Sequence, residues 1–249
     1  MKTTNNTVLI TGGSMGIGFE IAQQLSEKGN HVIITGRDKN RLEAAAAKLN
    51  NVTAIAYDVT DAAQTTQLAT RLADEFPQLN ILINNAGYAS SYETSVADAT
   101  GVAEKAALEM NTNYLSLVRL TEQLLPQLRK QEAAAVVNVT SIVAIAPGMR
   151  TPTYSASKAA VHAYTRLLRL SLKDSTVKVF ELMPPLVATE FSKEIGGLEN
   201  GIPAAQVAGD LVNALENNKW EIHVGATAQI FALDRQSPEQ ALHALNGVA

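Results

Sequence analysis

The stretch "TVLITGGSMGIG" at residues 7–18 determines how the rest of the chain folds. Its first five residues form a β-branched, apolar run that predicts a buried strand, and a glycine-rich turn follows directly. A helical pattern then begins and continues to residue 29. Glycines let the backbone approach a pyrophosphate, and the first N–H groups of a helix bind anions. We therefore expect a nucleotide-binding turn, although a purely structural tight turn gives the same pattern.

The same alternation of short apolar runs and helical patterns continues along the chain. The further predicted strands are 31–35, 53–57, 81–84, 135–140, 177–182 and 221–224. The helical patterns that separate them are 38–49, 61–76, 102–130 and 153–173. Asp38 and Asp61 occupy N-cap positions, and Gly29 occupies a C-cap position. Together these features predict an α/β fold: a Rossmann-like, doubly wound parallel sheet of about seven strands with helices on both faces, in one domain over residues 1–249.

The composition excludes several classes of protein. The chain has 249 residues, of which 46% are hydrophobic and 18% are charged, with a formal net charge of −4. The mild acidity and the lack of a basic run argue against a nucleic-acid partner. There is no cysteine, so disulfides and thiolate catalysis are excluded. No apolar stretch is long enough to span a membrane, and the first residues lack a signal peptide, so we expect a cytoplasmic protein. The four histidines have no paired metal-ligand spacing, so no metal is expected.

Several motifs occur in the order and spacing of one enzyme family. They are "TGGSMGIG" (11–18), "NNAG" (84–87), Asn113, Ser141 and "YSASK" (154–158). Over residues 7 to about 190 the chain resembles the short-chain dehydrogenase/reductase family. The segments 181–191 and 221–225 are similar to the branch that contains the DltE-type oxidoreductases. The resemblance implies an oxidoreductase that transfers a hydride between a nicotinamide cofactor and a carbonyl or secondary alcohol.

The glycine-rich turn and the end of the second predicted strand bear on the choice of cofactor. The turn residues expected to contact the cofactor are Gly12, Ser14, Met15, Gly16, Ile17 and Gly18. NAD-binding folds usually place an acidic residue after the second strand, but this chain has Gly36 followed by Arg37. A guanidinium can pair with a 2′-phosphate, which a carboxylate would repel. We therefore expect NADP, with NAD as the alternative, and we expect Asp38 to serve as a helix N-cap.

The resemblance assigns further cofactor contacts. Asp58 and Val59 would contact the adenine, although an aspartate in "DVTD" could simply form a turn. Asn85, Ala86 and Gly87 would lie beside the cofactor at the end of the fourth strand. After the sixth strand the corresponding residues are Pro184, Val187 and Thr189. Many relatives have Pro-Gly where this chain has two prolines, and the second proline cannot donate an N–H.

Tyr154 and Lys158 are four residues apart and would project from one face of a helix. A free phenol, with a pKa near ~10, is a poor base at neutral pH, and a nearby cation stabilises its phenolate. Ser141 follows a strand and could hold a substrate oxygen, with Thr140 as its nearest competitor. Asn113 matches the asparagine that anchors a water in the proton relay of the family, and Asn111 is its rival.

Three functional hypotheses remain. In the first, Tyr154 is the general acid and base of a carbonyl reductase or alcohol dehydrogenase. The second is a non-catalytic sensor or scaffold that binds NAD(P), but such proteins usually lose the tyrosine or the lysine. The third, a nucleotide-sugar epimerase, needs a longer chain and a different glycine spacing. The resemblance also implies a homodimer or homotetramer that associates through the two long helices.

Loops at the carboxyl ends of the strands should bind the small-molecule substrate. These loops are 88–97, 142–153 and about 186–202. The apolar "IVAIAPGM" (142–149) favours a lipophilic ketone or aldehyde, but loop packing explains it equally well. Arg150 could meet an anionic substrate or remain on the surface. The glycine-containing segment 191–201 is typical of a mobile lid.

Overall fold

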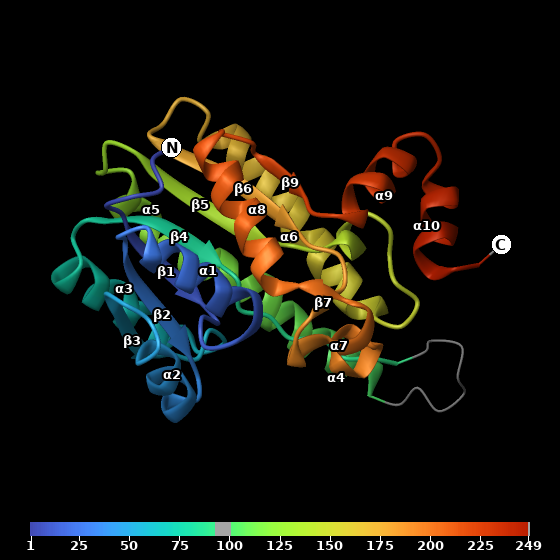
Figure 1. Cartoon of the computed structure of the whole chain (residues 1–249), viewed down its shortest axis with the longest axis horizontal. Helices are drawn as coiled ribbons and strands as arrows, with labels where there is room; N and C mark the ends of the chain where they lie inside the picture. Colours follow the sequence, from blue (N-terminus) through green and yellow to red (C-terminus); the bar gives the residue numbers. More distant parts are fainter. Residues whose placement is uncertain (93–100, 249) are drawn as a thin grey trace.

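A parallel sheet forms the centre of the protein in the computed structural model, which describes residues 1–92 and 101–248 (Figure 1). Its strands lie in the order β3-β2-β1-β4-β5-β6-β9. Their bounds are β1 (Thr7–Thr11), β2 (His31–Gly36), β3 (Val52–Ala56), β4 (Leu79–Asn84), β5 (Ala134–Val139), β6 (Val177–Met183) and β9 (Glu221–His223). All seven predicted strands are therefore confirmed, and the predicted bounds differ from the observed ones by at most two residues.

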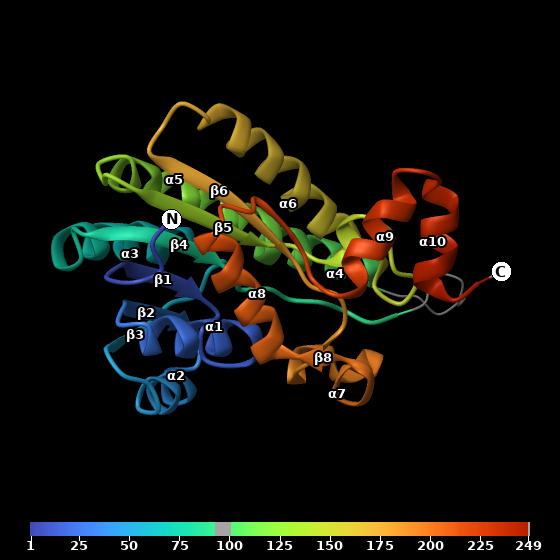
Figure 2. The same ribbon diagram turned by 45° about the horizontal axis from the view of Figure 1, so that its top comes forward.

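Helices cover both faces of this sheet (Figures 1 and 2). One layer contains α1 (Gly16–Glu27), α2 (Lys39–Ala46) and α8 (Ala204–Glu216). The other contains α3 (Ala62–Glu75), α4 (Val102–Glu109), α5 (Ser116–Leu128) and α6 (Pro152–Ser171). Successive strand residues point to opposite faces, so Val8 and Ile10 pack toward α1 whereas Leu9 packs toward α3. The nearly continuous apolar strands are thus buried on both sides.

Local signals fix where several helices begin and end. The Asp38 side chain accepts a hydrogen bond from the N–H of Arg41, and Asp61 accepts from the N–H groups of Ala63 and Gln64. Both predicted N-caps are confirmed. Gly29 follows the last turn of α1 with φ +80°, a left-handed conformation that glycine adopts without steric cost.

The predicted helix at 102–130 contains one irregular turn. A π-helical segment, Met110–Leu115, joins α4 to α5. Such wide turns occur often at functional sites. This one carries Asn113, whose side chain is buried between α6 and the chain that follows β4.

The region after β6 contains elements that the sequence patterns did not reveal. They are β7 (Val187–Ala188), a 3-10 helix (Glu190–Ile195), α7 (Gly197–Asn200), β8 (Ile202–Pro203), the helix α8 already described, α9 (Ala226–Asp234) and α10 (Pro238–Asn246). The helices α9 and α10 stand beyond one end of the sheet (Figure 2). A Cβ on Gly201 would lie 2.4 Å from the Ala188 nitrogen, so close packing explains this glycine without a hinge. That 191–201 moves as a lid stays a prediction.

Among the residues described, no helix is both long and apolar enough to cross a bilayer. The single domain over 1–249 and the cytoplasmic location stay predictions.

Candidate active site

A cavity of about 1060 Å³ lies along the carboxyl ends of the parallel strands. The turn between β1 and α1 and the segments that follow β2 to β6 all contribute to its wall. Strand order reverses between β1 and β4, and such switch points are where doubly wound sheets bind ligands. The size and place of the cavity suit an extended dinucleotide with space for a small substrate.

Backbone geometry at the glycine-rich turn fits a bound pyrophosphate. Gly12 and Gly16 have φ of +67° and +56°. A Cβ on Gly12 would lie 3.0 Å from the Ala86 Cα, so any side chain would crowd the floor of the cavity. The predicted turn residues that line the cavity are Gly12, Ser14, Met15, Gly16 and Ile17.

Gly18 does not line the cavity, and its contact with a cofactor stays a prediction. A Cβ there would lie 2.4 Å from both the Gly12 oxygen and the Asn85 Nδ2. Gly18 therefore allows the first turn of α1 to pack against the glycine-rich turn, and the Gly18 backbone lies behind the surface that would meet a cofactor.

Asn85 holds the glycine-rich turn against the end of β4. Its Nδ2 donates to the carbonyl oxygens of Thr11 and Gly12, at 2.9 and 3.1 Å. The Thr11 hydroxyl accepts from the N–H groups of Asn85 and Ala86, both at 3.0 Å. Asn85 thus braces the turn and also lines the cavity.

Two arginines lie at the end of the cavity beside β2. Gly36 and Arg37 line it there, and so does Arg41 on α2, whose Nη1 is 3.4 Å from the Met15 sulfur. Asp38 also borders this end, but its carboxylate caps α2 and lies 3.7 Å from the Arg41 guanidinium. The sequence reasoning missed Arg41. No local pattern marked it, because Arg41 reaches the cavity from the first turn of α2 through the packing of that helix.

Asp58 forms a turn at the wall of the cavity. One carboxylate oxygen accepts from both the N–H and the hydroxyl of Thr60. The turn reading of "DVTD" is therefore confirmed, and a contact with the adenine stays a prediction. The other predicted cofactor residues on the wall are Val59, Ala86, Gly87, Pro184, Val187 and Thr189.

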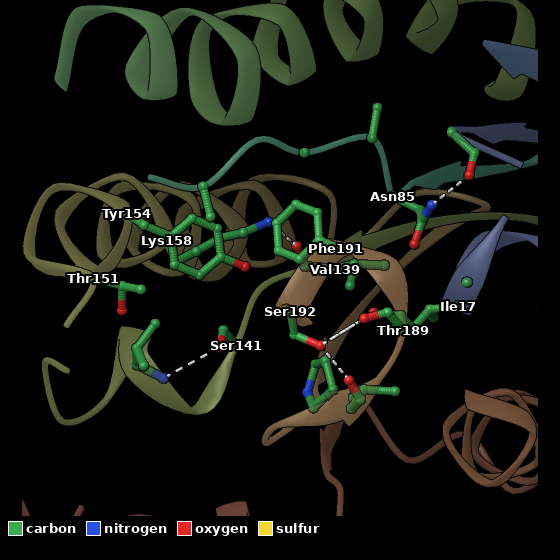
Figure 3. Close-up of a pocket in the computed structure, with 18 of the residues that line it drawn as sticks. Ile17, Asn85, Val139, Ser141, Thr151, Tyr154, Lys158, Thr189, Phe191 and Ser192 are labelled. Atoms are coloured by element: carbon green, nitrogen blue, oxygen red, sulfur yellow. Dashed lines mark hydrogen bonds between the residues drawn. The ribbon is translucent and has the colours of Figure 1, made fainter. Parts of the chain in front are cut away.

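Tyr154 and Lys158 project together from α6 into the middle of the cavity (Figure 3). The Lys158 Nζ lies 5.6 Å from the centre of the tyrosine ring and donates to the Val139 oxygen at 2.8 Å. Ser141 begins a 3-10 turn after β5, and its hydroxyl accepts from the Val143 N–H at 3.3 Å. The Phe191 ring, which the sequence reasoning also missed, packs 5.9 Å from that of Tyr154.

Burial changes the proton affinity of both α6 side chains. It raises the pKa of Tyr154 well above its usual 10, an effect that interaction with the Ser141 hydroxyl opposes and the Glu109 carboxylate increases. Burial also lowers the pKa of Lys158 to about 8, which the Glu181 carboxylate opposes. In the free protein the phenol is thus protonated at neutral pH and able to donate, with a cation beside it.

The structure gives Thr140 and Ser141 different partners, and it shows where the Asn113 side chain lies. The Thr140 hydroxyl donates to the buried Glu181 carboxylate, so Ser141 is the hydroxyl beside Tyr154. Asn113 does not line the cavity. Its Nδ2 donates to the Ser157 hydroxyl and the Tyr88 oxygen, each at 2.8 Å, and it thereby ties α6 to the loop after β4.

The substrate end of the cavity is largely apolar. Its apolar lining residues are Val143, Met149, Leu186, Phe191, Ile195, Leu245 and Val248. Of the segment 142–149, Ile142 and Ala146 are buried in packing, and a lipophilic substrate stays a prediction. The Arg150 guanidinium donates to the Glu194 oxygen at 2.8 Å, which is a structural role.

The C-terminal helix α10 also contributes to the substrate end. The Asn246 side chain accepts from the Met149 N–H at 2.7 Å and donates to the Pro147 oxygen at 2.9 Å. The sequence carries no local signal for this contact, which joins residues almost a hundred positions apart. Of the predicted substrate loop 88–97, residues 93–97 lie outside the described residues.

No group of three or more histidine, aspartate or glutamate side chains within residues 1–92 and 101–248 could hold a metal ion.

Comparison with known proteins agrees with this geometry. The family model described as short chain dehydrogenase matches residues 6–199. The "uncharacterized oxidoreductase DltE" of Bacillus subtilis is 39% identical, with 89% of each chain covered. A serine 3-dehydrogenase of Agrobacterium fabrum is 37% identical over 76% of this chain and 74% of its own. Among solved structures, a short chain dehydrogenase from Burkholderia cenocepacia in complex with NADP superposes with a TM-score of 0.85, at 28% identity and 98% coverage of both chains.

The lowered pKa of Lys158 should make stability depend on pH. Between about 8, its pKa in the folded protein, and 10.5, its ordinary value, the unfolded chain binds more protons than the folded one. Stability from this group therefore rises with pH across that window. The free energy of unfolding of the wild type, minus that of Lys158→Met, should increase between pH 8 and pH 10 by roughly 1 kcal/mol per pH unit.

Urea denaturation at several pH values measures this difference. Lys39→Met is the matched control, because it removes the same side chain from an exposed position on α2. A flat difference for Lys158→Met would contradict the assigned environment of Lys158.

Proposed function

The chain belongs to the short-chain dehydrogenase family and is an NAD(P)-dependent oxidoreductase that acts on CH–OH or C=O groups; we propose that it prefers NADP and that Tyr154 is its general acid and base. The observation that carries this proposal is the common wall shared by Ser141, Tyr154 and Lys158, opposite a glycine-rich turn shaped for a pyrophosphate.

Each residue has a defined task in the proposed reaction. The bound cofactor would supply or accept a hydride. The Ser141 hydroxyl holds the substrate oxygen, and the Tyr154 phenol donates a proton to that oxygen during reduction. Lys158 stabilises the phenolate that remains and is also within reach of the cavity that would hold the ribose. In oxidation the same groups act in reverse, with Tyr154 accepting the proton.

Asn113 has a supporting task in this proposal. Its two donated hydrogen bonds fix the first turns of α6 relative to the chain after β4. This contact positions Tyr154 and Lys158, which lie on the same part of α6, in the cavity. Its carboxamide oxygen accepts from the Tyr88 N–H at 2.7 Å. We keep the family's relay water beside Asn113 as part of the proposal.

The substrate would be a small carbonyl compound or alcohol with an apolar remainder. Support comes from the seven apolar side chains at the substrate end, which lie beside polar lining residues such as Thr151 and Asn246. Arg150 also lines the cavity, and one of its N–H groups donates to the Glu194 backbone oxygen; an anionic group on the substrate is the alternative that Arg150 would favour.

Replacing Tyr154 by phenylalanine tests the proposed acid. This variant keeps the ring packing but removes the proton, so kcat should fall by roughly a hundredfold or more while NADPH affinity changes little. The measurement is nicotinamide absorbance over a panel of ketones, aldehydes and secondary alcohols.

Tyr164→Phe on the same helix is the control, because its ring packs against Tyr114 outside the cavity. Retained activity in Tyr154→Phe would show that Tyr154 is not the general acid. Cofactor binding without turnover on any compound of the panel would instead favour the non-catalytic sensor.

Arg37 and Arg41 support the preference for NADP. Both are cations at the β2 end of the cavity, where Gly36 replaces the usual acidic residue. A 2′-phosphate placed there would gain charge-assisted hydrogen bonds that NAD cannot make. NAD stays the alternative.

Removing both guanidinium groups should weaken the binding of NADPH more than the binding of NADH. In Arg37→Ala/Arg41→Ala, the dissociation constant of NADPH should rise by roughly tenfold or more, whereas that of NADH should change less than about twofold. Fluorescence titration with each cofactor measures both constants. Lys39→Ala, which removes a neighbouring cation outside the cavity, should leave both unchanged. Equal losses for the two cofactors would contradict a phosphate contact.

We also propose that the chain forms a dimer or tetramer through α5 and α6. Leu167 and Leu170 on α6 are 65% and 64% exposed, and Leu115 at the start of α5 is 47% exposed. Leucines gathered on neighbouring helices are typical of a covered surface. The double variant Leu167→Lys/Leu170→Lys should therefore have a lower mass by light scattering than the wild type, and an unchanged mass would exclude this face.

A further inference from the structure

A buried acidic group lies behind the Tyr154 and Lys158 pair. Glu181 on β6 is 0% exposed, and its carboxylate has two side-chain partners. The Thr140 hydroxyl donates to it at 2.8 Å, and the His162 Nδ1 lies 2.9 and 3.0 Å from its two oxygens. Burying a carboxylate without hydrogen-bond partners destabilises a protein strongly, so the two hydrogen bonds to Glu181 are needed to keep it in the core. The proposed reaction assigns no task to this group.

Three consecutive residues at the end of β5 link this carboxylate to the proposed catalytic groups. The Val139 oxygen accepts from Lys158, the Thr140 hydroxyl donates to Glu181, and the Ser141 hydroxyl lies beside Tyr154. The end of β5 is therefore tied on one side to α6 and on the other to β6. A shift of the Glu181 carboxylate would therefore move Thr140 and, with it, the adjacent Val139 and Ser141.

His162 completes the same connection from α6. It lies four residues after Lys158, so the two side chains leave the same face of the helix one turn apart. Lys158 bonds to β5, and His162 bonds to the carboxylate on β6. These two contacts fix the rotation of α6 over the strand ends.

We propose that Glu181, held by Thr140 and His162, is a positioning residue that fixes the end of β5 beneath α6 and supplies the buried negative charge that keeps Lys158 cationic. The second half of this inference rests on the proposed function, in which the Lys158 cation stabilises the Tyr154 phenolate. Burial of Lys158 favours its neutral form, and the Glu181 carboxylate is the group that opposes this effect on its pKa.

Other charged groups near the cluster have different partners. Glu109 acts on Tyr154 from α4, and Glu221 on β9, which pairs in register with Glu181, binds the Arg169 guanidinium at 3.0 Å. Burial lowers the pKa of His223 on β9, and the charged groups that also act on this pKa are Glu221, Lys219, Glu181 and His162. Of these carboxylates, Glu181 is the one bound by Thr140, next to the Val139 oxygen that accepts from Lys158.

The experiment follows the titration of Lys158 by NMR in protein labelled on lysine side chains, with the signal assigned by its loss in Lys158→Arg. In Glu181→Gln the titration midpoint should fall by about one pH unit, because the opposing charge is gone while a hydrogen-bonding side chain of the same size remains. Glu181→Asp keeps the charge and should stay near the wild-type midpoint. Glu221→Gln is the matched control and should also stay there.

Turnover provides the second readout. In Glu181→Gln, kcat near neutral pH should fall by roughly tenfold. NADPH affinity at low pH, where Lys158 is cationic in both proteins, should change less than about twofold. Glu181→Asp should restore much of the lost kcat, which a loss of packing volume alone would not explain.

An unchanged Lys158 midpoint in folded Glu181→Gln would overturn the inference. If that variant does not fold, Thr140→Val replaces it, because it keeps the charge but releases the carboxylate from the end of β5. Because the Glu181 charge remains, the Lys158 midpoint should stay near that of the wild type in Thr140→Val, whereas kcat near neutral pH should fall and Thr140→Ser should keep most of it. An unchanged kcat in folded Thr140→Val would overturn the inference. The titration needs neither cofactor nor substrate, so its failure is distinct from the failure of Tyr154 as the acid.

Discussion

The hydrogen bond from the Lys158 ammonium to the Val139 oxygen is the contact on which the arrangement of the site depends. The lysine is 4% exposed, and a buried cation is tolerated only with partners that offset its desolvation. The backbone oxygen at the end of β5 and the nearby Glu181 carboxylate are those partners. Because Lys158 is held there, Tyr154 one turn earlier must also face the cavity. The need to satisfy one buried charge thus fixes how the Tyr154 and Lys158 side chains lie in the cavity.

A second constraint acts at the opposite wall, where the glycine-rich turn meets the end of β4. Asn85 and Thr11 bind the two segments together through four hydrogen bonds, and the absence of a side chain at Gly12 and Gly18 allows the contact. The parallel sheet carries both walls. Its strands end on a common edge, so turns far apart in sequence border one cavity.

Much of this could be predicted because the signals are local or depend on spacing. The β-branched runs identify all seven sheet strands, and Asp38 and Asp61 mark helix starts. The spacing of Tyr154 and Lys158 places both on one face of a helix. What local patterns missed depends on partners elsewhere in the chain. Arg41 enters the cavity only because α2 packs beside the glycine-rich turn, and Asn246 reaches Pro147 only because α10 folds back over the substrate end.

The sequence by itself determined the alternation of strands and helices and the residue types at the site, because strand and helix periodicity and backbone freedom at glycine are properties of short segments. Only the tertiary structure decided which of two adjacent residues contacts which partner. Thr140 and Ser141 are adjacent hydroxyls with equal chemistry, yet β6 brings a buried carboxylate to the first and α6 brings a phenol to the second. Gly18 likewise matches the glycine pattern of a cofactor-binding turn, but only the packing of α1 against the Gly12 backbone shows why a side chain is excluded there. Such assignments depend on distances between elements that no local pattern encodes.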